Sequence, residues 1–167
     1  MKSRSILIAT VTAAALSVLP GVAHAADVDE SANIGSRGAS SYTAEGAVAI
    51  QAAKENCGVR VNRPHPSGTT PRQIHTRVES FCKTGVVTSN KITGKSYRSR
   101  WYGWEHRKTK SNGPKAKSYI RVTVDPSCKP GDKHRWRTEG YGRAVINGKA
   151  YTASAYEQND KEITCRG

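Results

Sequence analysis

The sequence has no leucine or methionine after Leu19. Its other leucines, Leu7 and Leu16, and its single methionine also lie within the first 19 residues. The whole chain has one phenylalanine, Phe81. Packed helices favour Leu, Met and Ala, whereas Val, Ile, Tyr and Trp suit the pleated, half-buried surface of a sheet. The larger apolar residues that remain are mainly of the second kind, so composition alone favours an all-β domain.

Motifs of common hydrolases and phosphate-binding enzymes are also missing. The sequence contains no G-x-S-x-G, no H-E-x-x-H and no glycine-rich phosphate loop. It has no C-x-x-C pair, and no histidine stands near a cysteine at ligand spacing. We therefore expect no metal site and no cofactor.

Acidic residues are scarce relative to basic ones. The chain has 27 Lys and Arg against 13 Asp and Glu, which gives a formal net charge of +14. The excess lies after Cys57, because the segment 26–56 is weakly acidic. A strong positive charge favours association with anionic partners and says nothing about fold. The expected partner is an anionic polymer, namely cell-wall phosphates, acidic polysaccharide or extracellular nucleic acid.

Residues 1–25 match the pattern of a secretory signal peptide. Lys2 and Arg4 precede an apolar run from Ile6 to Leu19, and the small-residue motif Ala23-His24-Ala25 follows. The run is shorter than the roughly 20 residues that a membrane-spanning helix needs. We expect cleavage before Ala26, no transmembrane anchor, and a secreted, extracellular, monomeric protein.

Residues 26–56 are expected to form a flexible leader that precedes the folded domain. The segment 26–41 consists largely of Ala, Ser, Gly, Asn and acidic residues, a composition typical of disordered chain. The alanine-rich segment Thr43 to Asn56 is compatible with one short helix, with Thr43 as its N-cap. Residues 57–167 are then the basic all-β domain.

Four cysteines lie in that domain: Cys57, Cys82, Cys128 and Cys165. An even number in a short exported chain predicts two disulfides. Three pairings are possible, and we favour Cys57–Cys82 and Cys128–Cys165 because each joins segments that neighbour each other along a meander. This arrangement leaves no thiol to act as a nucleophile.

Period-two alternation predicts six or seven short antiparallel strands. The strongest signal is Asn147-Gly148 between the alternating runs His134–Ile146 and Lys149–Glu157, because a type I′ hairpin turn needs positive φ at both positions. Further strands are expected at Gly58–Val61, Gln73–Cys82, Tyr97–His106, Tyr119–Asp125 and Glu162–Cys165, with turns at Lys91–Lys95 and loops at 62–71 and 109–118. This spacing predicts a small β-sandwich or barrel, braced by two disulfides.

The segment from Tyr97 to Lys110 is unusually rich in cations and rings. If it alternates as one strand, Tyr97 and Trp101 face the core, while neighbouring side chains face solvent. In the C-terminal hairpin, the small and apolar residues from Trp136 to Ile146 face inward and the arginines face outward. These assignments predict one ligand-binding face made of Arg98, Arg100, Tyr102, Trp104, Arg121, Arg135, Arg137, Tyr141 and Arg143.

Arginine guanidinium groups form paired hydrogen bonds with the oxygens of phosphate and carboxylate groups, and they stack on aromatic rings. Such a face is therefore suited to binding an anionic polymer. The competing interpretation is that these side chains only cover an exposed sheet, with their stems packed and their charged heads in water. The choice depends on which strands are adjacent.

Three side chains on one strand face, His75, Arg77 and Glu79, are the candidates for catalysis. A Glu base, a His acid and an Arg that stabilises phosphate charge would suit metal-free RNA cleavage, so a small secreted ribonuclease is the alternative function. The same residues also fit a simple surface ion pair beside a polar histidine. A protease inhibitor is the third class considered, with the proline-rich segment 62–71 as its protruding loop.

The signal segment, the spaced cysteines and the segment "HRWRTEGYG…NG" resemble small secreted two-disulfide proteins of actinomycetes of uncharacterised function. The resemblance implies export and a β fold. It implies no activity and no site residues.

Overall fold

The computed structural model describes residues 35–44 and 57–167, and within these ranges the regular structure is entirely β-strand. The seven longer strands are β3 (Cys57–Val61), β5 (Ile74–Cys82), β6 (Val87–Arg100), β7 (Gly103–Asn112), β8 (Tyr119–Val124), β10 (Trp136–Ile146) and β11 (Lys149–Gln158). Five strands are shorter: β1 (Ala39–Ser41), β2 (Thr43–Ala44), β4 (His65–Pro66), β9 (Lys133–His134) and β12 (Ile163–Thr164). The expected all-β fold is confirmed, whereas the predicted signal peptide lies outside the described residues.

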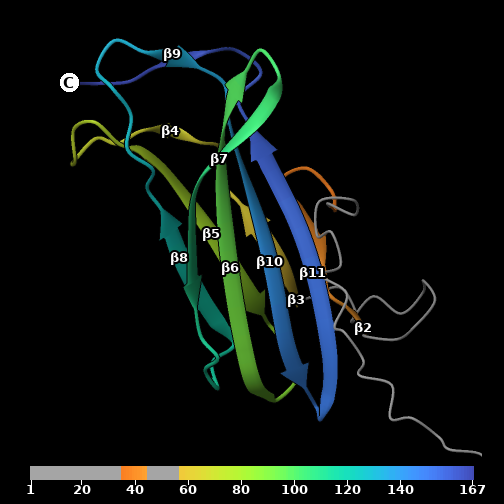
Figure 1. The fold of residues 1–167 in the computed structure, drawn as a ribbon. Coiled ribbons are helices and arrows are strands. Elements are labelled where there is room, and N and C mark those ends of the chain that lie inside the picture. The colour runs from red at the N-terminus through yellow and green to blue at the C-terminus, as the bar shows by residue number, and fades with distance from the viewer. Residues whose placement is uncertain (1–34, 45–56) are drawn as a thin grey trace, which may run out of the picture.

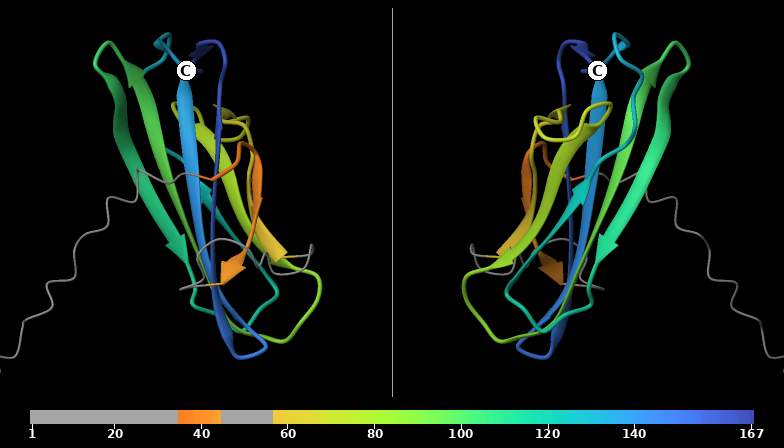
Figure 2. Two further views of the ribbon diagram at one scale, coloured as in Figure 1. Left: turned by 90° about the vertical axis from the view of Figure 1, so that its right-hand side faces the viewer. Right: turned by 90° about the vertical axis from the view of Figure 1, so that its left-hand side faces the viewer.

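Two antiparallel sheets lie face to face, as the edge-on views of Figure 2 show. The front sheet has the strand order β2-β11-β10-β6-β7, and it faces the viewer in Figure 1. The back sheet runs β1-β3-β5-β8, with β4 paired to the start of β5. The small pair β9 and β12 lies at one end. The described strands therefore form a sandwich and not a closed barrel.

Valines of the back sheet pack against glycines of the front sheet. A Cβ atom placed on Gly140 would lie 2.5 Å from Val78 Cγ1, and one on Gly94 would lie 2.5 Å from Val124 Cγ2. Glycine inside a strand marks such a close approach. The segment 91–95 was predicted as a turn because of Gly94, and this prediction is wrong: the segment lies inside β6, where a larger residue would collide with the opposite sheet.

The hairpin of β10 and β11 has the predicted turn and faces. Asn147 and Gly148 have φ values of 50° and 76°. In the register of the two strands, Tyr151 lies opposite Ala144. The alternate residues of β10 from Trp136 to Ile146 are buried, so the expected inward face is confirmed.

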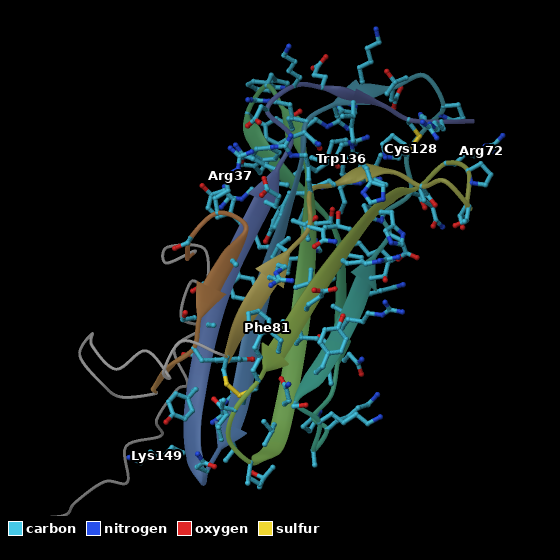
Figure 3. The ribbon with its side chains drawn as sticks, turned by 180° about the vertical axis from the view of Figure 1, so that it is seen from behind. Arg37, Arg72, Phe81, Cys128, Trp136 and Lys149 are labelled. Carbon is cyan, nitrogen blue, oxygen red and sulfur yellow. A yellow bond between two sulfur atoms is a disulfide. The ribbon has the colours of Figure 1, made fainter. Side chains whose placement is uncertain are left out.

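Both predicted disulfides are present. Cys57 and Cys82 lie directly opposite each other on β3 and β5. Cys128 and Cys165 are joined at the far end of the sandwich, where Trp136 and Ile74 pack with them into a second, smaller core (Figure 3). Each end of the sandwich is thus tied by one bridge.

The folded domain begins before Cys57, contrary to the predicted boundary. β1 pairs with β3, and β2 pairs with β11 at the edge of the front sheet. Between them, Tyr42 is fully buried with its hydroxyl 2.7 Å from Ser80 Oγ, which donates to Asn90 Oδ1. Burial raises the pKa of Tyr42 to about 12. The expected helix from Thr43 starts instead as strand β2, and residues 45–56 lie outside the described residues.

The segment expected to be one strand, 97–106, is a hairpin. β6 ends at Arg100 and β7 begins at Gly103, so Trp101 and Tyr102 form the turn. β7 continues to Asn112, which shortens the predicted polar loop at its start. The described part of the chain contains no helix of the length and hydropathy needed to cross a membrane.

Candidate functional site

The register between β6 and β10 determines which side chains share the solvent surface of the front sheet. Residues directly opposite each other in a ladder point to the same side. Arg137 lies opposite Tyr97, and Arg143 lies opposite Lys91. The alternate positions of both strands are buried against the back sheet. These four side chains therefore lie on the surface that faces away from the core.

The outer face is defined here as this surface of β6, β7, β10 and β11 together with the residue before β10. Its charged and aromatic members are Lys91, Lys95, Tyr97, Trp104, His106, Arg135, Arg137, Glu139, Tyr141, Arg143 and Tyr156. Five of these side chains are Lys or Arg and one is acidic. The face is therefore basic and carries rings on all four strands.

Cations and rings are paired across this face. Arg137 Cζ lies 4.5 Å from the centre of the Tyr156 ring, and Arg135 Cζ lies 5.9 Å from the centre of the Trp104 ring. Lys95 Nζ lies 4.8 Å from the centre of the Tyr141 ring. These distances are within the range of cation–π attraction. The pairs link four neighbouring strands into a continuous cationic and aromatic surface.

Glu139 is the carboxylate of the outer face, and it is covered. The residue is 4% exposed. Arg137 Nε lies 3.0 Å from its Oε1, and the Tyr141 hydroxyl donates a hydrogen bond to its Oε2 at 2.8 Å. Its negative charge is therefore satisfied within the protein and presents little repulsion to an anion outside.

Of the predicted binding residues, the structure brings five together on the outer face: Trp104, Arg135, Arg137, Tyr141 and Arg143. The sequence interpretation missed Lys91 and Lys95 because their segment was taken for a turn. It also placed Tyr97 in the core, whereas its position opposite Arg137 puts it outside.

The assignment of Arg98 to the surface is wrong. It lies opposite the buried Trp136 and is 7% exposed. Its Nη2 donates to Glu105 Oε2 at 2.8 Å. An arginine is tolerated on the inward side here because the carboxylate opposite it on β7 compensates its charge.

Trp101 and Tyr102 are at the hairpin turn, so neither belongs to the outer face. The expectation that Trp101 lies in the core is wrong, since the residue is 95% exposed. Arg121 does not join the face either, because β8 belongs to the back sheet. There it lies opposite Glu79.

Three arginines converge on Glu105 near the hairpin turn. Arg100 Nε donates to Glu105 Oε2 at 2.6 Å, Arg98 shares that oxygen, and Arg107 Nη1 lies 3.0 Å from Oε1. Hydrogen bonds from Arg100 first, and then from Arg98, lower the pKa of Glu105 to about 2. The same arginines line a hollow of about 380 Å³ whose other wall is formed by Ser127, Cys128, Lys129 and Asp132.

The ion cluster at Glu105 is expected to give the hairpin turn an acid transition. The pKa of Glu105 in the folded protein, about 2, lies below its ordinary value of 4.5. The ion pairs of Glu105 therefore stabilise the hairpin fully at pH values above 4.5, and this stabilisation is lost as the pH falls towards 2. Hydrogen exchange of the Arg98–Arg107 amides, measured across this range, should show the loss of protection. In Glu105→Gln this pH dependence should disappear, while the control Glu162→Gln should keep it. An unchanged profile in Glu105→Gln would contradict the assignment.

The candidate catalytic residues His75, Arg77 and Glu79 lie on the solvent side of β5 in the back sheet, which faces the viewer in Figure 3. Glu79 accepts a hydrogen bond from the Tyr119 hydroxyl at 2.9 Å and lies opposite both Arg60 and Arg121. Its carboxylate is therefore already engaged in the sheet surface.

His75 lies beside His65, with ring centres 5.4 Å apart. Burial lowers the pKa of His75, and electrostatic interactions with His65 and Arg77 lower it further. The described residues contain no group of three or more His, Cys, Asp or Glu placed to hold a metal ion.

Comparisons with protein families, curated proteins and solved structures found no match to this chain.

Proposed function

We propose that the protein binds anionic polymers through the outer face of the front sheet. The candidate ligands are cell-wall phosphates, acidic polysaccharide and extracellular nucleic acid. The excess of basic over acidic residues, with a net charge of +14, supports attraction to such polymers. The five cations of the outer face would supply the direct contacts.

The observation that carries the proposal is the pairing of cations with rings across four strands. A ring beside a guanidinium restrains its side chain and leaves its charge intact, so less conformational entropy is lost when an anion binds. The carboxylate of Glu139 is buried beside Arg137 and accepts a hydrogen bond from the Tyr141 hydroxyl. The surface is therefore pre-organised and positive, which a surface that only covers a sheet does not require.

We also propose that the protein acts outside the cell. The two disulfides fit an oxidising compartment, where such bonds form and persist. The predicted signal peptide supports the same location. Anionic polymers of the cell surface and of the surroundings are accessible there.

The salt dependence of binding tests the proposal. Each phosphate contact releases counterions, with a log–log slope of about −0.7 per contact for a single strand and −0.9 for a duplex. If all five cations of the outer face make contacts, the slope is expected to be roughly −3.5 to −4.5. Fluorescence anisotropy with labelled polyphosphate, RNA and duplex DNA measures it. Absence of saturable binding at physiological salt would contradict the proposal.

Incubation with RNA separates binding from the ribonuclease alternative. Binding predicts RNA that shifts on a gel and stays intact after the protein is removed. The ribonuclease alternative predicts fragments whose formation is abolished by His75→Ala and Glu79→Gln, and intact RNA would exclude it.

A further inference from the structure

The turn of the β6–β7 hairpin presents two aromatic side chains that the fold does not bury. Trp101 is 95% exposed and Tyr102 is 61% exposed. Their rings meet edge to face, with centres 5.3 Å apart. Nearly the whole indole is open to solvent, so a flat group can reach it. The turn lies at the same end of the molecule as β9 in Figure 1.

The hollow beside this turn keeps an excess of positive charge. Arg98, Arg100 and Arg107 surround the single carboxylate of Glu105, which leaves two positive charges uncompensated within the cluster. On the opposite wall, Lys129 offsets Asp132. An anionic group that enters the hollow therefore meets arginine donors whose charge Glu105 does not cancel.

The exposed rings directly follow an arginine that lines the hollow, because Arg100 precedes Trp101 in the chain. From this juxtaposition we propose that the hairpin turn and the arginine hollow form a site for single-stranded nucleic acid. One base stacks on Trp101 or Tyr102, and an adjacent phosphate enters the hollow. The inference rests on the proposed binding of anionic polymers, and it names the class of polymer.

A single strand fits these observations better than a duplex or polyphosphate does. Base–aromatic stacking is available to any unpaired base, whereas a duplex keeps its base faces stacked on each other. Polyphosphate has no ring to offer the indole. With polyphosphate as the ligand, the rings of Trp101 and Tyr102 would therefore make no stacking contact.

The test compares two ligands of equal phosphate number, a single-stranded oligothymidylate and inorganic polyphosphate. Trp101→Ala/Tyr102→Ala is expected to weaken oligothymidylate binding roughly 5- to 150-fold and to leave polyphosphate binding unchanged. Oligothymidylate, but not polyphosphate, should also quench tryptophan fluorescence, and more strongly in the unmodified protein than in the variant. Both replaced side chains are exposed, so thermal unfolding should not change.

A second variant tests the hollow. Arg100→Ala/Arg107→Ala removes two cations, so the slope of log affinity against log salt for oligothymidylate should become shallower by about 1.4 if both contact phosphate. The charge-matched control Lys115→Ala/Lys117→Ala changes two exposed lysines of the β7–β8 loop and should leave the slope unchanged.

The outcomes separate this inference from the proposed function. Equal weakening of both ligands by the Trp101/Tyr102 variant, or no weakening of either, would overturn the stacking site while leaving the outer face intact. Equal weakening of a duplex would overturn it too. If the variant instead loses affinity only for vesicles of anionic phospholipid, the turn is a membrane contact and the inference is wrong. Failure of the proposed function would show differently, as insensitivity of both ligands to Arg135→Ala/Arg137→Ala.

Discussion

Trp136→Ala is expected to lower the free energy of unfolding by about 3–5 kcal/mol. Trp136 is 1% exposed and packs with Ile74 and the Cys128–Cys165 bridge in the smaller core (Figure 3). Removal of the indole leaves a cavity. The neighbouring residues in the sequence, Arg135 and Arg137, cannot fill it without burying their charge. Denaturant unfolding followed by circular dichroism measures the loss.

Trp101→Ala is the matched control, because it makes the same chemical change on the exposed hairpin turn. It should leave the free energy of unfolding unchanged. Similar losses in both variants would contradict the assignment of Trp136 to the core and of Trp101 to the surface.

Cys128→Ala/Cys165→Ala is expected to lower the free energy of unfolding by roughly 3–4 kcal/mol, because the bridge closes a long loop of the unfolded chain. The two cysteines are 37 residues apart in the sequence. The bridge also anchors the segment 127–132, which forms one wall of the arginine hollow. Its removal should therefore loosen that wall as well. Chemical denaturation and oligothymidylate binding measure the two effects.

Cys57→Ala/Cys82→Ala provides the control. This bridge joins β3 to β5 and its cysteines are 25 residues apart, so its loss should destabilise the protein by a similar amount. It lies at the other end of β5, away from the hollow. Oligothymidylate affinity under conditions where both variants are folded should fall only in Cys128→Ala/Cys165→Ala. Equal falls would mean that the loss of affinity comes from general destabilisation and not from the wall that Cys128–Cys165 anchors.

Local signals in the sequence were sufficient for the fold class, the hairpin and the disulfides. The absence of Leu and Met after residue 19 favours sheets over helices, and period-two alternation strengthens this prediction. Asn147-Gly148 specifies its turn through backbone conformation, which needs no knowledge of distant partners. The bridges follow from neighbouring segments. Each of these inferences concerns residues close in sequence or a property of the whole chain.

The residues of the outer face depended on non-local pairing, and there the sequence was misleading. Alternation along Tyr97–His106, with Tyr97 and Trp101 taken as the inward residues, put Tyr97 in the core and Arg98 outside. In the structure, Ile92 and Gly94 of β6 face the valines of the back sheet, and the same alternation then carries Arg98 inward and Tyr97 outward. Glu105 makes this possible by lying opposite Arg98 on β7. Had β6 been recognised as one long strand, alternation from Ile92 would have given the correct faces.

The remaining errors arose because the order of the strands in the sheets cannot be read from the sequence. Arg121 has the same local pattern as the arginines of β10, but β8 pairs with β5 and so lies in the other sheet. Tyr42 was assigned to the leader because its neighbours are small and polar, yet it fills a space left by Gly142 in the front sheet. Neither sheet membership nor a gap opposite a glycine can be read from a single segment.

The most direct test of the outer face compares two variants that lose the same charge. Arg135→Ala/Arg137→Ala removes two cations that lie beside rings on the outer face, and Lys115→Ala/Lys117→Ala removes two from the exposed β7–β8 loop. The measurement is the slope of log affinity against log salt for a labelled polyanion. The arginine variant should reduce the magnitude of that slope by roughly 1.4–1.8 and lower affinity, while the lysine variant should match the unmodified protein. Equal losses in both variants would mean that only total charge matters and that the outer face is not a binding site.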